Sequence, residues 1–469
     1  MSESRSRVEP FVLLVTAHVA MLGKQGLIDD AAVQVISNVV DRIGAGSFDQ
    51  DDPRSLLLDF DAKVDAQSPP GFAGASQVGR GVNELVAAYV RVVLRTRLLA
   101  LSDQIGQARE DLIDLAVQHV VTTMPAYQQG LAVQPTTLAH LLGAILGPLD
   151  RAQTKVQQAY ALVNQSPLGA GAMVSTGLPI DRQEAAANAG FEGVIENTFD
   201  AVAAVDHLAA VSEALRAVAR PISRFMNEIA TLYRTDPSSL VLNDASPQVR
   251  SELPQHKVIP AFDELTRLGV ELDAVLDSLD RWIDRSPLEP QAEMALPLGR
   301  FDLAFDAVGR LIERFLAFLN REIAFNRAYL ANRANRNHTT IGELADYLML
   351  EEQIPPAQAR EMAARVMAQL RDEGVETSGI TSAMVDSAGM LILGRELGVE
   401  FETISRYLAP RRFIERRAGL GGPAPMATRE WLTREKEHLA VDRAWVAERR
   451  AALAEIESAM KALASDEVG

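Results

Sequence analysis

Residues 166–172 read SPLGAGA, and the chain continues with PIDR at 179–182 and GVIEN at 193–197. This small-residue segment separates two stretches in which apolar residues recur with the period of an α-helix, at about 134–164 and 184–233. Helices of this length cannot be covered by short loops, so they predict a helical bundle that also uses a partner subunit. Further stretches of the same kind lie at about 81–122, 260–285, 300–334 and 429–465.

Composition narrows the possible functions. The 469 residues carry 46 Lys and Arg against 63 Asp and Glu, a formal net charge of −17. An excess of negative charge argues against nucleic-acid binding, which needs clustered cations. The absence of cysteine excludes disulfides, thiolate zinc sites and iron–sulfur clusters. The N-terminal apolar stretch at 11–15 has no small-residue cleavage site and is too short for a membrane span, which predicts a soluble cytoplasmic protein.

Three breaks divide the helical pattern, at 51–70, 166–181 and 237–260. The last has four prolines and lies between two strong helical patterns, which favours a functional loop. Near the C-terminus, Thr340 and Glu343 have the spacing of a capping box for a helix over 341–348. A second helix is predicted at about 357–372, with Gly374 placed to end it.

These segments, taken in order, resemble argininosuccinate lyase, a family of the fumarase/aspartase superfamily. The resemblance spans roughly residues 10 to 430 and implies an all-α, three-domain fold whose long central bundle forms a tetramer core between subunits. The implied domains are 1–80, 81–337 and 338–469, with the motif loop 244–260 in the second. Besides the segments quoted above, the matching blocks are GRGVN at 79–83, MPAY at 124–127, QPTT at 134–137, FDAV at 305–308, ADYL at 345–348 and GGPAP at 421–425.

The resemblance implies an elimination in which a base removes a proton beside a carboxylate and an amine leaves to give fumarate. The doubly negative intermediate needs cations and hydrogen-bond donors. In the family the base is thought to be a serine on a mobile loop, and here two alignments remain open. Counting back from Lys257 places Ser251 in that position, whereas counting forward from Asp244 places Arg250 there. We prefer Ser251, because the residues from Lys257 onward align without a gap.

Several positions depart from the family pattern. Its Thr-His pair becomes Gln128-Gln129, so the relay histidine is missing, while Glu264 survives as the carboxylate that would orient it. Its Ser-Arg pair becomes Gly81-Val82, and the asparagine of its loop becomes Ile259. Glu293, Leu298 and Phe301 occupy the positions that bind the arginine portion of the substrate in the family. The resemblance therefore implies a substrate other than argininosuccinate.

The residues that this comparison nominates for a site fall into two groups, and no metal or cofactor is expected. The remaining histidines, His438 among them, show no metal-ligand spacing to one another and are interpreted as structural. The expected catalytic residues are Ser251, Lys257, Gln129 and Glu264, and the expected substrate-binding residues are Asn83, Arg80, Gln128, Gln134 and His256.

Two functional hypotheses follow. The first is a homotetrameric lyase that eliminates an amine or a related leaving group from a substituted succinate, with no nucleic-acid or membrane partner. It predicts that Ser251, Lys257, Asn83 and Gln129 converge in a cleft between subunits. The second is a catalytically inactive homologue kept as a scaffold or binding protein. It predicts an apolar or blocked cleft, with Arg250 and Glu293 facing solvent or paired with each other.

Overall fold

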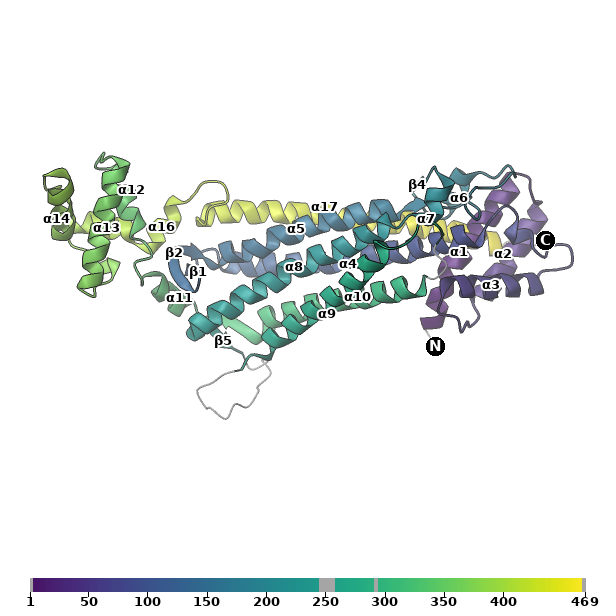
Figure 1. The fold of residues 1–469 in the computed structure, drawn as a ribbon, viewed down its shortest axis with the longest axis horizontal. Coiled ribbons are helices and arrows are strands. Elements are labelled where there is room, and N and C mark those ends of the chain that lie inside the picture. The colour runs from purple at the N-terminus through teal and green to yellow at the C-terminus, as the bar shows by residue number, and fades with distance from the viewer. Residues whose placement is uncertain (1–2, 244–257, 291–293, 466–469) are drawn as a thin grey trace.

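The computed structural model describes residues 3–243, 258–290 and 294–465 (Figure 1). Within these ranges the chain forms seventeen α-helices and three small two-stranded sheets. The expected helical class is therefore confirmed, and the strands are short additions to it. None of the described helices combines the length and the apolar character that crossing a bilayer requires.

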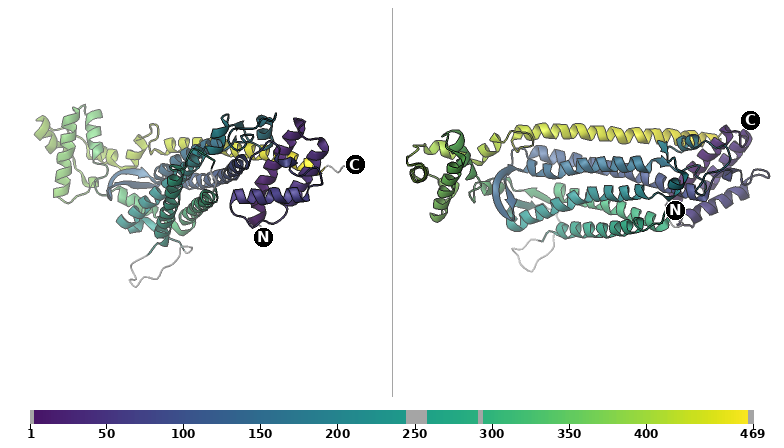
Figure 2. Two further views of the ribbon diagram at one scale, coloured as in Figure 1. Left: turned by 45° about the vertical axis from the view of Figure 1, so that its right-hand side comes forward. Right: turned by 45° about the horizontal axis from the view of Figure 1, so that its top comes forward.

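The centre of the molecule is an elongated bundle of long helices that lie side by side (Figures 1 and 2). The bundle helices are α4 (Val82–Gln118), α5 (Leu138–Val163), α8 (Asp206–Thr235), α9 (Pro260–Ile283) and α10 (Ala295–Ala317). Their apolar faces form one continuous core. In the helix α8, for example, five apolar residues recur at helical spacing and are all buried: Leu208, Val211, Leu215, Val218 and Ile222.

Smaller helical groups lie at the two ends of the bundle (Figure 1). The N-terminal group is α1 (Glu3–Lys24), α2 (Asp30–Gly44) and α3 (Pro53–Gln67). The long helix α17 (Pro425–Ser465) then returns along the bundle and packs against α4, α5 and α2. The group at the opposite end has a separate apolar core and comprises α12 (Gly342–Leu350), α13 (Pro356–Asp372), α14 (Ser382–Leu393), α15 (Phe401–Leu408) and α16 (Pro410–Arg416).

Two predicted helices are interrupted. The pattern over 184–233 is divided among α6 (Arg182–Asn188), α7 (Thr198–Ala203) and α8, because Gly190 takes a left-handed φ of 75° and Asn197 caps a new helix. The pattern over 300–334 breaks after α10 into a π-helical turn (Phe318–Glu322), the strand β6 (Ile323–Phe325) and α11 (Arg327–Ala334). The break has a non-local cause, since β6 pairs antiparallel with β5 (Leu240–Leu242).

The predicted capping box at Thr340 is wrong. The helix α12 starts at Gly342 without a side-chain cap, and the Glu343 side chain, 3% exposed, is instead paired with Arg416 and Arg417. The Arg417 Nη2 atom lies 2.6 Å from Glu343 Oε1. A buried carboxylate with two guanidinium partners satisfies its charge better than one backbone N–H would. The next helix agrees with expectation, because α13 covers Pro356–Asp372 and Gly374 follows it with a φ of 65°.

Candidate functional site

The three candidate glutamines all lie on one β-hairpin. Its strands are β1 (Thr123–Gln128) and β2 (Leu131–Thr137), and its turn residues Gln129 and Gly130 both have positive φ, 53° and 79°. Two such residues in succession are typical of a tight type I′ hairpin turn. Gln128, Gln129 and Gln134 are exposed, so their amide groups are available at this end of the bundle.

A polar cluster that sequence analysis missed anchors the hairpin. Asp236 is buried where α8 ends, and it accepts hydrogen bonds from the Tyr127 hydroxyl on β1 and, at 3.2 Å, from the Tyr329 hydroxyl on α11. The Arg333 Nε atom lies 3.0 Å from Asp236 Oδ1. Burial, followed by the hydrogen bond to the Asp236 carboxylate, raises the pKa of Tyr127 well above its ordinary value. The hairpin is thus tied to the bundle by a satisfied buried charge.

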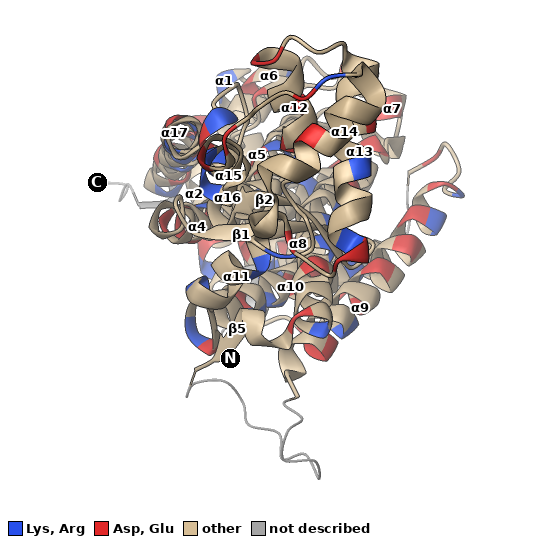
Figure 3. Cartoon of the chain, turned by 90° about the vertical axis from the view of Figure 1, so that its left-hand side faces the viewer, with Lys and Arg blue, Asp and Glu red and all other residues tan. Residues whose placement is uncertain are grey.

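Figure 3 looks onto this end of the molecule, where the hairpin packs against α11 and α16. The N-terminus of α5 is next to it, capped by the Thr137 hydroxyl, which accepts a hydrogen bond from the His140 N–H. His140 Nδ1 lies 2.9 Å from Thr136 Oγ1, and its Nε2 lies 3.1 Å from the Gly421 carbonyl oxygen. The blocks QPTT and GGPAP, far apart in sequence, therefore meet through His140.

The GRGVN and SPLGAGA segments meet at the opposite end of α4. The Asn83 Nδ2 atom donates to the Ala172 carbonyl at 3.0 Å, and its Oδ1 accepts from Arg54 at 3.0 Å. Glu84 is fully buried and accepts hydrogen bonds from the backbone N–H groups of Gly81 and Gly171. Burial is the main cause that raises the pKa of Glu84 to about 7. Glu84 was not predicted, although its place three residues after a helix cap was a usable signal.

Arg182 holds the other side of the glycine segment. Its guanidinium donates to the carbonyls of Leu168, Ile195 and Glu196, at 2.9, 2.8 and 3.0 Å. These three bonds join SPLGAGA to GVIEN. The PIDR block therefore has a structural role, and these contacts do not require Arg182 to take part in catalysis.

Two nominated residues have charge partners within the chain. Arg80 is buried, its Nη2 lies 2.6 Å from Asp61 Oδ1, and its Nε donates to the Ser76 carbonyl at 2.6 Å. Glu264 on α9 is half-exposed and accepts a hydrogen bond from Arg314, which also bonds Glu322 at 2.7 Å. The Arg80–Asp61 pair joins α3 to the start of α4. The Arg314–Glu264 pair joins α9 to the end of α10.

The loop candidates Ser251, His256 and Lys257 lie outside the described residues, as do Arg250 and Glu293. Ile259, near the end of the loop, is 4% exposed and packs in the core. Phe301 is 1% exposed and also belongs to the bundle core, while Leu298 is half-buried beside it.

The candidate residues do not come together within one chain. Asn83 is in the first turn of α4, a helix of 37 residues. Gln129 is in the hairpin that comes after the last turn of this helix. At 1.5 Å per residue such a helix is about 55 Å long. Figure 1 shows the hairpin and the glycine segment at opposite ends of the bundle. A site that contains both Asn83 and Gln129 would therefore need more than one copy of the chain.

Comparison with known proteins identifies the class. A sequence profile of a family described as a lyase matches residues 72–269. Argininosuccinate lyase from Methanosarcina mazei is 29% identical over 435 residues, which cover 91% of this chain and 87% of the relative. Over most of its length the chain is therefore similar to lyases of the argininosuccinate lyase type.

Solved structures show the same relationship in three dimensions. EDDS lyase in complex with formate superposes with a TM-score of 0.84 and 26% identity, covering 98% of this chain and 92% of that protein. A variant of the same enzyme with bound fumarate gives a TM-score of 0.83 at the same identity and coverage. Class II fumarase from Schistosoma mansoni, at 11% identity and a TM-score of 0.66, shares the fold.

Proposed function

We propose that this protein is a carbon–nitrogen lyase that eliminates an amine, or a related leaving group, from a substituted succinate other than argininosuccinate. The observation that carries the proposal is the full-length match to EDDS lyase, an enzyme whose variant has been solved with bound fumarate. The product of such an elimination is fumarate, and the reverse reaction adds an amine to fumarate.

The proposed chemistry assigns roles to residues of the loop. Ser251 takes a proton from the carbon beside a carboxylate, which places a second negative charge on that carboxylate. Lys257 meets this charge, and the amine departs as the carbon–nitrogen bond breaks. Gln129 can hold a carboxylate as a hydrogen-bond donor, but an amide cannot transfer a proton as histidine does. Ser251 and Lys257 therefore carry the proposal, and Gln129 positions the substrate.

The size of the molecule supports a shared site. Because about 55 Å of helix separates Asn83 from Gln129, the lyase hypothesis requires that the ends of different chains meet, as they would in the homotetramer that we propose. The exposed apolar side chains of Val270 on α9 and Leu303 on α10, 64% and 57% exposed, are consistent with a bundle that buries more surface on assembly.

The chain offers little to the arginine portion of argininosuccinate. Phe301 is packed in the core, and neither it nor Leu298 has a hydrogen-bonding side chain. Polar groups of a ligand that are buried without partners cost roughly 1–3 kcal/mol each. A smaller or less polar leaving group fits these residues better.

The alternative, an inactive scaffold, is favoured by a different observation. Arg80 and Glu264 are in ion pairs inside the chain, and both ends of the Asn83 amide have partners. Side chains used in this way strengthen the fold, and a scaffold would retain them.

Fumarate release separates the two functions. The full chain is mixed with substituted succinates that carry different amines, and fumarate is followed by its ultraviolet absorbance. We expect release that falls at least about a hundredfold in Ser251→Ala and is unchanged in Ser238→Ala, an exposed serine close to the loop in sequence. Equal rates in the two variants would remove Ser251 from the reaction. No release from any substrate would favour the scaffold.

A further inference from the structure

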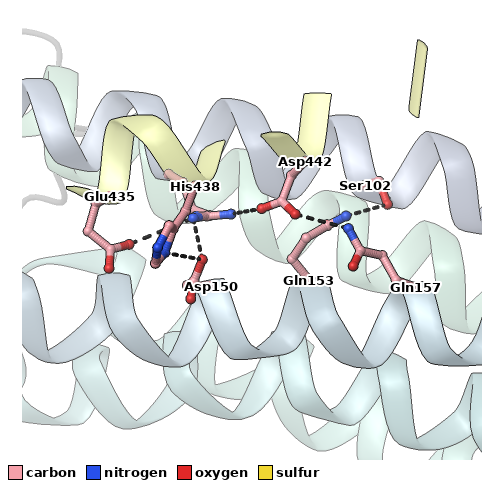
Figure 4. A network of polar contacts seen from close by, with 8 residues as sticks. Ser102, Asp150, Gln153, Gln157, Glu435, His438 and Asp442 are labelled. Atoms are coloured by element: carbon pink, nitrogen blue, oxygen red, sulfur yellow. Dashed lines mark hydrogen bonds and ion pairs between the residues drawn. The ribbon is translucent and has the colours of Figure 1, made fainter. Parts of the chain in front are cut away.

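A charged cluster lies where α17 packs against α4 and α5 (Figure 4). Arg109 of α4 is fully buried at its centre. Its Nη2 donates to Asp150 of α5 at 2.5 Å and its Nη1 to Asp442 of α17 at 2.5 Å. Glu435 and His438, also on α17, complete the cluster.

The cluster has more negative than positive charge. Asp150, Glu435 and Asp442 surround the single guanidinium of Arg109. With His438 neutral, three carboxylates and one cation leave two negative charges uncompensated. Gln157 donates to Asp442 at 2.9 Å but adds no charge. Buried charges persist when they are paired or when they coordinate a metal.

Glu435 provides a second, independent observation. The residue is 5% exposed, and its Oε2 has no hydrogen-bond partner among the described residues. Its contact with Arg109 Nη2 is long, 3.7 Å. A buried carboxylate oxygen without a hydrogen bond is costly and calls for a ligand.

Two further side chains lie close enough to Glu435 to share a ligand with it. Glu435 and His438 are three residues apart, so they lie on the same face of α17, and Figure 4 shows both directed toward Asp150. One ligand atom from each of these three residues lies within 4.8 Å of the others. Ligand atoms around a tetrahedral zinc ion are roughly 3.4 Å apart, so small rotations would close the site.

We propose that Asp150, Glu435 and His438 bind a divalent transition-metal ion of the Zn²⁺ type. An imidazole nitrogen with two carboxylate oxygens suits zinc or cobalt better than magnesium or calcium, which prefer oxygen ligands alone. The His438 side chain is 58% exposed, which leaves a path for the ion and room for a water ligand. Arg109 and Asp442 form the outer support, because Arg109 donates to both Asp150 and Asp442 and so fixes the Asp150 carboxylate.

A metal in this position would fasten the C-terminal helix to the bundle. Asp150 belongs to α5, and the other two ligands belong to α17. Binding only to the folded chain would raise the melting temperature as the metal concentration rises. The site therefore has a structural role and needs no part in the lyase reaction.

Titration of the metal-stripped full chain with Zn²⁺ tests the proposal. Calorimetry should find one site per chain, with an affinity that falls at least tenfold in His438→Ala and in Glu435→Gln. Co²⁺ should give a visible absorption band in the wild-type protein that His438→Ala abolishes. Because His438 is exposed, this variant should stay folded, which circular dichroism checks.

Glu437→Gln is the matched control, since Glu437 is exposed on the same helix between the two ligands. It should bind Zn²⁺ as the wild-type chain does. The proposal is overturned if Zn²⁺ does not bind, if His438→Ala binds it equally well, or if Glu437→Gln weakens binding as much as Glu435→Gln does. Equal affinity for Mg²⁺ would also overturn it, because that result indicates a nonspecific acidic surface.

Discussion

Gly81 lies directly against the backbone of Gly171: a Cβ atom on Gly81 would come within 2.5 Å of the Gly171 carbonyl carbon. The first residues of α4 and the glycine segment are thus in contact at a point where only glycine fits. The resemblance places a serine at position 81 in the family, and in this chain the two segments lie too close together to admit that side chain without a shift.

Restoring the serine should therefore be harmful. We expect Gly81→Ser to lower the free energy of unfolding by about 1–3 kcal/mol, because the segment at 169–172 must move to admit the side chain. Gly299→Ser is the control, since a Cβ there meets nothing within 4 Å. Urea unfolding of both variants gives the comparison, and equal stability would contradict the close approach.

Glu84 should make stability depend on pH. Burial raises its pKa from 4.5 to about 7, so the folded chain holds a proton that the unfolded chain releases. Between these pH values the unfolded state binds fewer protons, and the stability that Glu84 contributes falls as pH rises from about 4.5 through 7. The loss is on the order of 3 kcal/mol.

The measurement is the urea midpoint as a function of pH for the wild type and for Glu84→Gln, which cannot ionise. We expect the fall between pH 4.5 and 7 to be smaller in the variant. Parallel curves for the two proteins would show that Glu84 does not titrate in this range.

The apolar faces of the long helices should be covered by other copies of the chain. We expect a homotetramer, because the proposed site requires residues from opposite ends of α4 and because Val270 and Leu303 are exposed in the single chain. Sedimentation equilibrium at micromolar concentration measures the mass. A stable monomer there would rule out both the assembly and the shared site.

Lys257 should matter for activity and not for stability. Lys257→Met keeps much of the side chain's bulk but removes the charge that stabilises the intermediate. A contact of this kind contributes roughly 3 kcal/mol, so the rate should fall about a hundredfold. The melting temperature should not change, because we expect a residue of this loop to add little to the bundle core.

Lys155→Met is the control, as Lys155 is a half-exposed lysine on α5 far along the bundle. Full activity in Lys257→Met would remove this residue from the site. A large drop in its melting temperature would instead favour the scaffold, with Lys257 as a structural partner.

The long helices could be predicted because their signal is local. Apolar residues such as Leu208, Val211 and Leu215 repeat at helical spacing, and the structure buries all three. The end of α10 could not be predicted in this way. The strand at Ile323–Phe325 exists because residues 240–242, about eighty positions away, pair with it.

The candidate residues show the same division. The family motifs located the hairpin glutamines and the glycine segment. They did not predict that Arg80 pairs with Asp61 or that Glu264 pairs with Arg314, because each partner is on a different helix. The spacing of His438 to the other histidines predicts no metal site. The local signal for the proposed site is Glu435, three residues earlier on the same helix face, whereas Asp150 joins them only through the packing of α5.

The central claim, carbon–nitrogen lyase activity, is tested most directly in the direction of addition. The full chain is incubated with fumarate and a panel of amines that includes ammonia, ethylenediamine and amino acids, and mass spectrometry detects the substituted succinate. The account predicts product with at least one amine, no product from arginine, and none in Ser251→Ala. Argininosuccinate formed at a rate comparable to the others would contradict the assigned pocket, and no product with any amine would contradict the lyase.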